Sequence, residues 1–355
     1  MREVALSING IDFIGWETIR ITTSLEAFCG SFSLSVSDSK TKNEMSLSIK
    51  EGDECKIKIG EEIIITGYVD LKNISLTDSD HVFEVSGRDK TSDLIDCSAV
   101  LSAWQFDNIS VLEIAKKVAM PFGVKVALDK GLSLSANPPS LVVNPGESAY
   151  EVIDKAARLA GFFVISDNKG GLLFTKAGNN PSASSLNQSE NILAISVNFD
   201  SASCFRKYIV IGQSIGSDDT SGEEASDVKG IAFDMNVSRA SRVFMIQAEG
   251  AVTQKQAQDR AQWEAAVRRA AALTVNVTVQ GWAQVNGNLW KINCPVTLNC
   301  PVVGMTRDML ISQVVFNLTN AGTTTDLILR PKDSFLPKPV IQKEQNFNQE
   351  TNEDE

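Results

Sequence analysis

The sequence contains a single histidine, His81, in 355 residues. Ser-His-Asp and Cys-His catalysis, two-histidine metal sites and the HExxH zinc motif all need a histidine in a recognisable setting. His81 lies in DSDHVFEVSGRD, at the start of a predicted strand. The simplest interpretation of His81 is an exposed residue at the end of that strand. No GxGxxG and no GxxxxGK[ST] is present to cradle a nucleotide. We therefore expect a protein that is not an enzyme.

A basic surplus is also missing. The chain has 33 Lys and Arg against 44 Asp and Glu, which gives a formal net charge of −11. A protein that binds nucleic acid through its phosphates needs a basic face. No apolar run approaches the roughly 20 residues of a membrane helix, so we expect no membrane insertion. The N-terminus MREVALSING has no apolar core of a signal peptide. These absences predict a protein made in the cytosol.

The cysteines form no recognisable framework. Cys294 and Cys300 stand six residues apart, which is no standard zinc spacing, and no second pair accompanies them. In a reducing compartment such cysteines are best interpreted as small buried apolar groups. We expect no metal site and no cofactor.

The first ninety residues contain short segments with alternating polarity, such as ETIRITTS, CKIKIGEEIIITGYVDL and HVFEVSGRD. Turn residues separate them, including a predicted hairpin at Gly60–Glu61. Short strands at such spacing predict a small antiparallel barrel or sandwich.

A helical period follows, and it occurs twice. DNISVLEIAKKVAMPFGVKV and ESAYEVIDKAARLAGFFVIS each begin with a serine three residues before a glutamate, the signature of a capping box. Each predicted helix ends at a glycine and is followed by a predicted strand. We interpret this as a repeat within a small α/β module, although chance similarity of two capped helices is the alternative. The matched pairs are Ser110 with Ser148, Glu113 with Glu151, Lys117 with Lys155, Gly123 with Gly161, and Val126 with Val164.

The predicted fold class is mainly β with an α+β insert: two similar antiparallel β-barrels plus a small α/β module. We expect the first β-barrel over residues 1–97 and the α/β module with duplicated helix-strand units over 98–190. The second β-barrel should cover 191–335, with a helical excursion at 251–273. Residues 336–355 read as a disordered acidic tail.

Several side chains have both a functional and a structural interpretation. Arg88 and Asp89 could bind a ligand, but a turn held by side-chain hydrogen bonds is the simpler reading. Trp282 and Trp290 flank the hairpin signal Asn286–Gly287, where core packing is favoured over a sugar platform. Glu113 and Glu151 could serve as catalytic acids, yet capping accounts for both.

The octapeptide SFSLSVSD has one face that is clearly apolar and one that is unusual. Phe32, Leu34 and Val36 fall on the first face. The second face is a row of serines rather than the mixture of charged residues found on an ordinary wet strand. Small uncharged groups suit a face that meets a neighbouring subunit or a narrow channel, with a plain solvent-facing strand as the alternative. The candidate interface or lumen residues are Ser31, Ser33, Ser35 and Ser37.

Four segments, taken in order, resemble the tail hub proteins of Mu-like contractile phages: GRDKTSDLIDCSA, ESAYEVIDKAARLAGFFVISDNKGGLLFTKA, RAQWEAAVRRAAALTVNVTVQGWAQVNGNLWKINCPVTL and GTTTDLILRPKDSF. The resemblance covers residues 1 to about 337. Residues 148–177 are also similar to the wider phage late-control and secretion-spike hub family, through Arg158–Gly161 and the Gly170–Gly171 turn. In this chain Gly161 follows Ala160 directly, without the two-residue spacer of the family pattern.

The resemblance implies a structural protein without catalytic residues. Hubs of this family are homotrimers in which two barrels per chain form a pseudo-sixfold ring. That ring adapts the hexameric tail tube to the trimeric central spike, beside other baseplate proteins, and leaves a channel through which DNA passes without specific binding. The expected location is the tail baseplate of the virion, assembled in the host cytoplasm. An acidic channel wall would repel phosphate, and the chain's net charge suggests one.

Three alternatives stay open at the level of sequence. The same adaptor could serve a phage-derived contractile injection or secretion particle. The duplicated helix-strand units and the tryptophans permit a cell-wall-binding module. A glycan hydrolase that uses paired acids is the weakest of the three.

Overall fold

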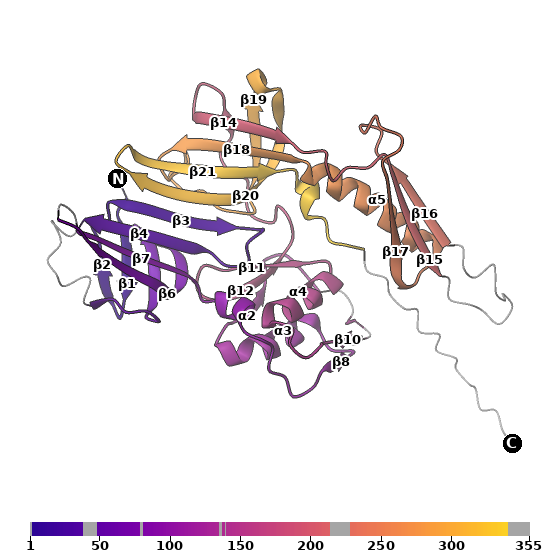
Figure 1. Ribbon diagram of the computed structural model, residues 1–355, viewed down its shortest axis with the longest axis horizontal. Coiled ribbons are helices and arrows are strands. Elements are labelled where there is room, and N and C mark those ends of the chain that lie inside the picture. The colour runs from indigo at the N-terminus through magenta and orange to yellow at the C-terminus, as the bar shows by residue number, and fades with distance from the viewer. Residues whose placement is uncertain are drawn as a thin grey trace. The chain divides into compact units, whose positions relative to one another are not determined.

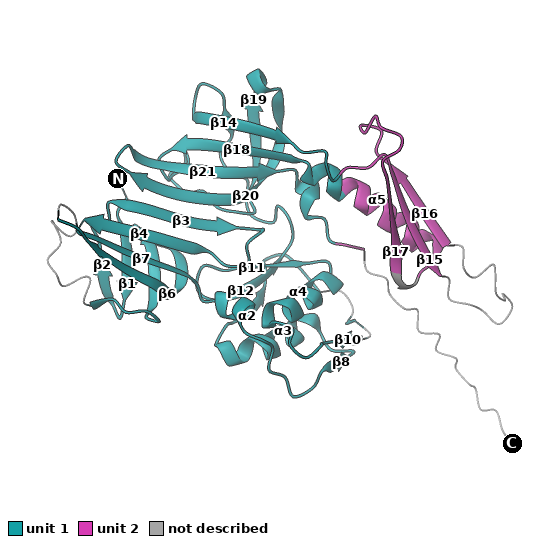
Figure 2. Ribbon diagram, in the orientation of Figure 1, with its two compact units in different colours: residues 1–203, 267–337 teal, residues 204–266, 338–355 magenta. Residues whose placement is uncertain are grey.

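A computed structural model describes residues 2–37, 48–78, 81–134, 137–138, 140–213 and 228–339. The chain forms two compact units, shown in Figure 2. The first comprises residues 1–203 and 267–337, and the second comprises residues 204–266 with the C-terminal segment 338–355.

The first unit is built on one sheet of 13 strands. Its N-terminal strands are β1 Val4–Ile8, β2 Ile11–Phe13, β3 Thr18–Ser24, β4 Ser31–Ser37, β5 Glu54–Ile59, β6 Glu62–Leu76 and β7 His81–Asp89. Its later strands are β13 Leu186–Asn187, β14 Ile192–Phe199, β18 Leu273–Gln280, β19 Pro295–Cys300, β20 Met305–Thr319 and β21 Gly322–Arg330. The predicted hairpin at Gly60–Glu61 is confirmed, since it joins β5 to β6.

The strand order is β14-β18-β21-β20-β3-β4-β7-β6-β5-β1-β2 (Figure 1). β19 pairs with β20, and β13 pairs with β19. The mainly β fold class is confirmed. The strands expected in two separate β units share this sheet, because β3 pairs with β20 over Ile19–Ser24 and Gln313–Leu318. Among the described strands the pairing runs from β14 to β2 without closing.

One face of this sheet carries the main apolar core. Phe32, Leu34 and Val36 of β4 are all buried there, as the alternation of SFSLSVSD predicts. Trp282 and Trp290 also belong to this core, so the packing interpretation of both tryptophans is confirmed.

Two glycines set the close approach of β6 and β7. A Cβ on Gly67 would lie 1.9 Å from the carbonyl oxygen of Arg88, and a Cβ on Gly87 would lie 2.0 Å from that of Tyr68. Any larger residue would therefore force the strands apart. Next to this contact, β6 has a bulge between Val69 and Leu71.

The helical module of the first unit has its own core of buried residues. Its helices are α2 Ser92–Asp96, α3 Val111–Ala119 and α4 Ala149–Leu159, with the short 3-10 turn η1 Met120–Phe122. Its strands are β8 Gln105–Asp107, β9 Val126–Leu128, β10 Ser140–Val142, β11 Phe163–Ser166 and β12 Leu172–Thr175. The two predicted helix-glycine-strand units appear as α3 with β9 and α4 with β11, and β12 lies between the two strands.

The capping boxes differ between the two units. Ser148 accepts a hydrogen bond from the backbone N–H of Glu151, whose carboxylate accepts one from the Ser148 N–H, so this box is confirmed. The box predicted at Ser110 and Glu113 is wrong. Ser110 is the N-cap of α3 but makes no side-chain cap bond, and the Glu113 carboxylate pairs with Lys116 at 2.8 Å.

The second unit has a three-stranded sheet, β16-β15-β17, formed by β15 Lys207–Gln213, β16 Val228–Phe233 and β17 Val243–Ala251. Helix α5, Gln254–Ala271, begins in this unit and packs directly on β16, where a Cβ on Gly230 would lie 2.0 Å from the Ala257 carbonyl oxygen. Gln254 and Gln258 bond the backbone N–H and C=O of Lys229 and Ile231. These amides satisfy the outer edge of β16 as a further strand would.

Two 3-10 turns, η3 Pro301–Val303 and η4 Lys332–Phe335, complete the described structure. The four-part domain division stays a prediction. Most of the predicted acidic tail, from residue 340 on, lies outside the described residues.

Candidate functional site

The serine row of β4 lies on the face of the sheet opposite the core. Ser31 is exposed, and Ser33, Ser35 and Ser37 are half-buried. The strand has β3 on one side and β7 on the other, so the row sits inside the sheet rather than at an edge. Its immediate neighbours are Thr18, Arg20 and Thr22 of β3, and Val82, Glu84, Ser86 and Arg88 of β7.

The same kind of face continues across the sheet. Opposed residues of an antiparallel pair share a face, so the strand registers identify the side chains next to the serine row, strand by strand. We call this set the polar face. Besides β4 and its neighbours it includes Gln313, Val315 and Asn317 of β20, Thr324, Asp326 and Ile328 of β21, Asn276, Thr278 and Gln280 of β18, and Ala194, Ser196 and Asn198 of β14.

Charged groups on the polar face are few, and most are held by neighbours. The Asp326 carboxylate accepts hydrogen bonds from the Thr278 hydroxyl at 2.6 Å and from the Asn317 amide at 2.8 Å. Ser33 donates to the Glu84 carboxylate at 3.0 Å. These bonds tie both carboxylates to neighbouring side chains of the sheet.

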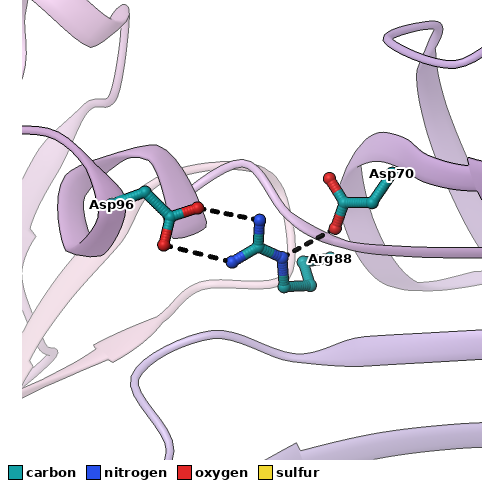
Figure 3. Close-up of polar contacts among 3 residues, drawn as sticks. All are labelled: Asp70, Arg88 and Asp96. Atoms are coloured by element: carbon teal, nitrogen blue, oxygen red, sulfur yellow. Dashed lines mark hydrogen bonds and ion pairs between the residues drawn. The ribbon is translucent and has the colours of Figure 1, made fainter.

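Arg88 closes one end of the polar face. Its guanidinium donates to Asp70 at 2.6 Å and to both oxygens of Asp96 at 3.3 and 2.8 Å (Figure 3). Asp70 is the bulged residue of β6 and Asp96 ends α2, so the arginine joins the sheet to the helical module. Hydrogen bonding to Arg88 lowers the pKa of Asp96, and the bonds to Asp96 and Asp70 raise the pKa of Arg88. All three side chains are partly exposed, so each pair contributes at most about 1 kcal/mol.

Asp89 has a purely structural role in the described contacts. Its side chain is 1% exposed and accepts hydrogen bonds from the Thr91 N–H at 3.0 Å and the Ser166 hydroxyl at 2.7 Å. Burial raises the pKa of this carboxyl, and the hydrogen bonds partly offset that rise. The interpretation of Arg88 and Asp89 as a bonded turn is therefore supported over a ligand site.

The remaining candidates do not assemble into a reactive centre. Burial raises the pKa of Cys55 to about 12 and that of Cys294 to about 11, which disfavours their thiolates. Among the described residues no group of three or more His, Cys, Asp or Glu side chains could hold a metal ion. Residues 212–216 match GxSxG, the pattern around the nucleophilic serine of many hydrolases. Its serine, Ser214, lies outside the described residues.

Sequence reasoning found the serine row but missed the other strands of the polar face. The signal was present in ILAISVNF, LTVNVTVQ and GTTTDLILR, where Ser, Thr, Asn and Asp alternate with apolar residues. It could not be assembled without knowing that β3 pairs with β20. No described helix is long and apolar enough to cross a membrane.

Known proteins match the chain in both sequence and structure. Family models match residues 3–89 (Mu phage baseplate assembly protein GpP-like, N-terminal), 91–176 (baseplate hub protein gp44-like, second domain) and 253–338 (Mu phage baseplate assembly protein GpP, fourth domain). The baseplate hub protein gp44 of Escherichia phage Mu is 32% identical over 340 residues, 94% of this chain and 89% of that protein.

Two solved structures extend the comparison. The 43 kDa tail protein of prophage MuSo2 from Shewanella oneidensis has a TM-score of 0.84 at 30% identity, covering 94% of this chain and 99% of that one. An Escherichia coli type VI secretion component, described as similar to the T4 tail proteins gp27 and gp5, has a TM-score of 0.56 at 9% identity. It covers 95% of this chain and 80% of its own, and this second likeness shows the fold alone.

The fold and these relatives thus define a structural protein of a phage tail rather than an enzyme. More particularly, the chain belongs to the baseplate hub proteins of Mu-like phages.

Proposed function

We propose that three copies of this chain form the hub ring that adapts the hexameric tail tube to the trimeric central spike, and that the polar face lines the DNA channel of that ring. The observation that carries the proposal is the extent of the polar face. Mostly uncharged polar side chains, with few charged ones among them, cover strands from β14 to β7 on one side of a continuous sheet. An ordinary solvent-facing sheet would present more long charged side chains.

The charge of the polar face favours DNA that slides along the channel over DNA that binds to its wall. Arg20 and Arg88 are balanced by Glu84 and Asp326, so the net charge of the face is close to zero. A basic wall would bind phosphates and hold the DNA. This near-neutral wall replaces the acidic wall suggested by the charge of −11 for the whole chain. The acidic surplus then lies elsewhere on the protein.

The proposed partners are the central spike, the tail tube and the other baseplate proteins, with assembly in the host cytoplasm. The likeness to a type VI secretion component supports the alternative that the same adaptor serves a phage-derived injection or secretion particle. Capsid and terminase genes beside the gene for this chain would favour the phage.

The test is the native mass of the purified chain, combined with negative-stain electron microscopy. We expect a species of three times the chain mass that appears as a ring with a central hole. A stable monomer at tens of micromolar, alone and with the spike protein added, would contradict the proposal.

A further inference from the structure

The second unit, drawn in magenta in Figure 2, has a three-stranded sheet with one covered face. Alternate side chains of its strands, such as Tyr208, Val210 and Val228, form a core together with helix α5. Ala257 and Ala261 of α5 are fully buried in the same core. When one face of a sheet is packed in this way, the opposite face ordinarily meets water and carries polar side chains.

The opposite face of this sheet is mainly apolar instead. Side chains alternate along a strand, and opposed residues share a face, so the strand registers define three rows of three positions. We call these nine positions the outer face. The rows are Phe233, Lys207 and Val243, then Ile231, Ile209 and Met245, then Lys229, Ile211 and Gln247. The middle row is entirely apolar, and the charged side chains are two lysines.

The apolar side chains of the outer face are accessible to another molecule. Phe233 is 59% exposed, Met245 is 56% exposed and Val243 is 44% exposed. They surround Ile209, the central position, which is itself buried. Single exposed apolar residues are normal on a protein surface, but apolar residues on three adjoining strands form a patch. Such a patch marks a surface that another molecule covers.

The charges of the outer face narrow the chemistry of that molecule. The Lys207 ammonium lies over the Phe233 ring, 5.8 Å from its centroid. Lys229 is exposed, and its backbone rather than its ammonium is bonded to Gln254. Neither ammonium has an ion pair among the described residues. Burying an unpaired ammonium is strongly unfavourable, so a partner that covers this face has to bring carboxylates.

The outer face of a second copy does not meet this requirement. It holds two further lysines and no carboxylate, so two outer faces packed together would bury ammonium groups without anions. The chain belongs to the baseplate hub proteins, and a hub has to contact other proteins of the baseplate. The chemistry of the outer face therefore fits a different protein of the same particle.

From these observations we infer that the outer face docks another baseplate protein, through a surface with apolar side chains at its centre and carboxylates beside them. The apolar side chains of the partner cover Phe233 and Met245, and its carboxylates pair with Lys207 and Lys229. The inference goes beyond the proposed function, because it needs neither the ring nor the channel. It gives a role to the second unit, which carries no strand of the polar face.

The direct test is photo-cross-linking in assembled particles. The photoreactive residue p-benzoyl-phenylalanine replaces Met245 in the full-length chain, and irradiation joins it to the molecule that covers the outer face. Val243 is a second position, so that the result does not depend on one variant. The matched control is Met120, which is 73% exposed in the helical module of the first unit. Mass spectrometry identifies the partner and its cross-linked segment.

We expect Met245 and Val243 to give the same covalent product with a different particle protein, and Met120 not to give it. The cross-linked segment should contain apolar residues together with Asp or Glu.

A second measurement uses the purified partner. Lys229→Glu should raise the dissociation constant at least about tenfold, because it sets carboxylates against each other. Lys255→Glu, an exposed position on α5, is the matched control and should bind normally. Replacement of the opposing carboxylate of the partner by lysine should restore binding to Lys229→Glu.

The outcomes separate this inference from the proposed function. A cross-link only to a second copy, only to residues 340–355 of the same chain, or to nothing at either position would overturn the docking surface. Equal binding by Lys229→Glu and Lys255→Glu would also overturn it, because the carboxylates are part of the inferred surface. A ring of three without the cross-link would reject the docking surface and leave the hub ring standing. The cross-link in a chain that forms no ring would contradict the hub ring alone.

Discussion

Ser33 donates a 3.0 Å hydrogen bond to the carboxylate of Glu84, across the pair of strands β4 and β7. The bond joins the last two strands of the polar face, with Arg20 on the other side of Ser33. A serine here therefore contributes little bulk and no charge of its own, while it holds a neighbouring charge near the sheet. This property suits the proposed DNA channel.

The first prediction is that Ser33→Lys and Ser35→Lys impair the particle more than the fold. Both serines are half-buried on a polar face, where an added lysine can extend outward and Glu84 can offer a partner. We expect the free energy of unfolding to change by about 0.5 kcal/mol. DNA delivery by assembled particles should fall at least tenfold, because two lysines in three copies add six positive charges to the channel.

Thermal unfolding and a delivery assay on the same preparations measure both quantities. Ser33→Thr keeps the hydroxyl and the neutral charge, so it is the matched control and should deliver DNA normally. Equal delivery by the lysine and threonine variants would show that Ser33 and Ser35 do not face the channel.

The second prediction concerns the close contact of β6 with β7. In Gly87→Ala the new methyl group would meet the Tyr68 carbonyl oxygen and the Phe32 ring. The strands must then separate beside the polar face, and we expect a loss of roughly 1–3 kcal/mol of stability. Denaturant unfolding measures the loss. Ser86→Ala, one residue earlier on the polar face, should cost less than about 0.5 kcal/mol. Similar losses in the two variants would mean that the contact is not tight.

The third prediction follows from the buried carboxyl of Asp89. Burial raises its pKa in the folded state above the ordinary value of 3.8. The folded state therefore holds this proton more strongly than the unfolded state. Asp89 contributes most to stability below pH 3.8, and that contribution decreases as the pH rises through the folded-state pKa.

Asp89→Asn cannot lose a proton and so lacks this dependence. Its stability relative to the native protein should therefore increase with pH above 3.8 and then level off. Urea unfolding of both proteins across this range measures the difference. A difference that decreases with rising pH would mean that the folded state stabilises the carboxylate instead.

Local patterns were sufficient to predict much of the fold. The alternation of SFSLSVSD correctly predicted which residues of β4 are buried, because side chains alternate in any strand. The repeated helix-glycine-strand units were also recognisable. The capping box at Ser110 does not form, since Ser110 makes no side-chain cap bond and the Glu113 carboxylate pairs with Lys116, one turn along α3. Sequence spacing alone does not decide between two such partners.

The pairing of strands that are far apart in the sequence could not be predicted from local patterns. The joining of the two β units depends on β3 and β20, which pair Ile21 with Phe316. Neither strand has a sequence feature that identifies the other as its pairing partner. The polar face could be recognised only after these pairings were known.

The central claim is that the polar face lines the channel of a trimeric ring, and a cryo-electron microscopy map of the assembled hub tests it most directly. The account predicts three copies whose Ser33, Thr278 and Ser196 all point toward the central axis. A ring in which these side chains point outward, or are covered by a neighbouring protein while another surface lines the channel, would contradict it.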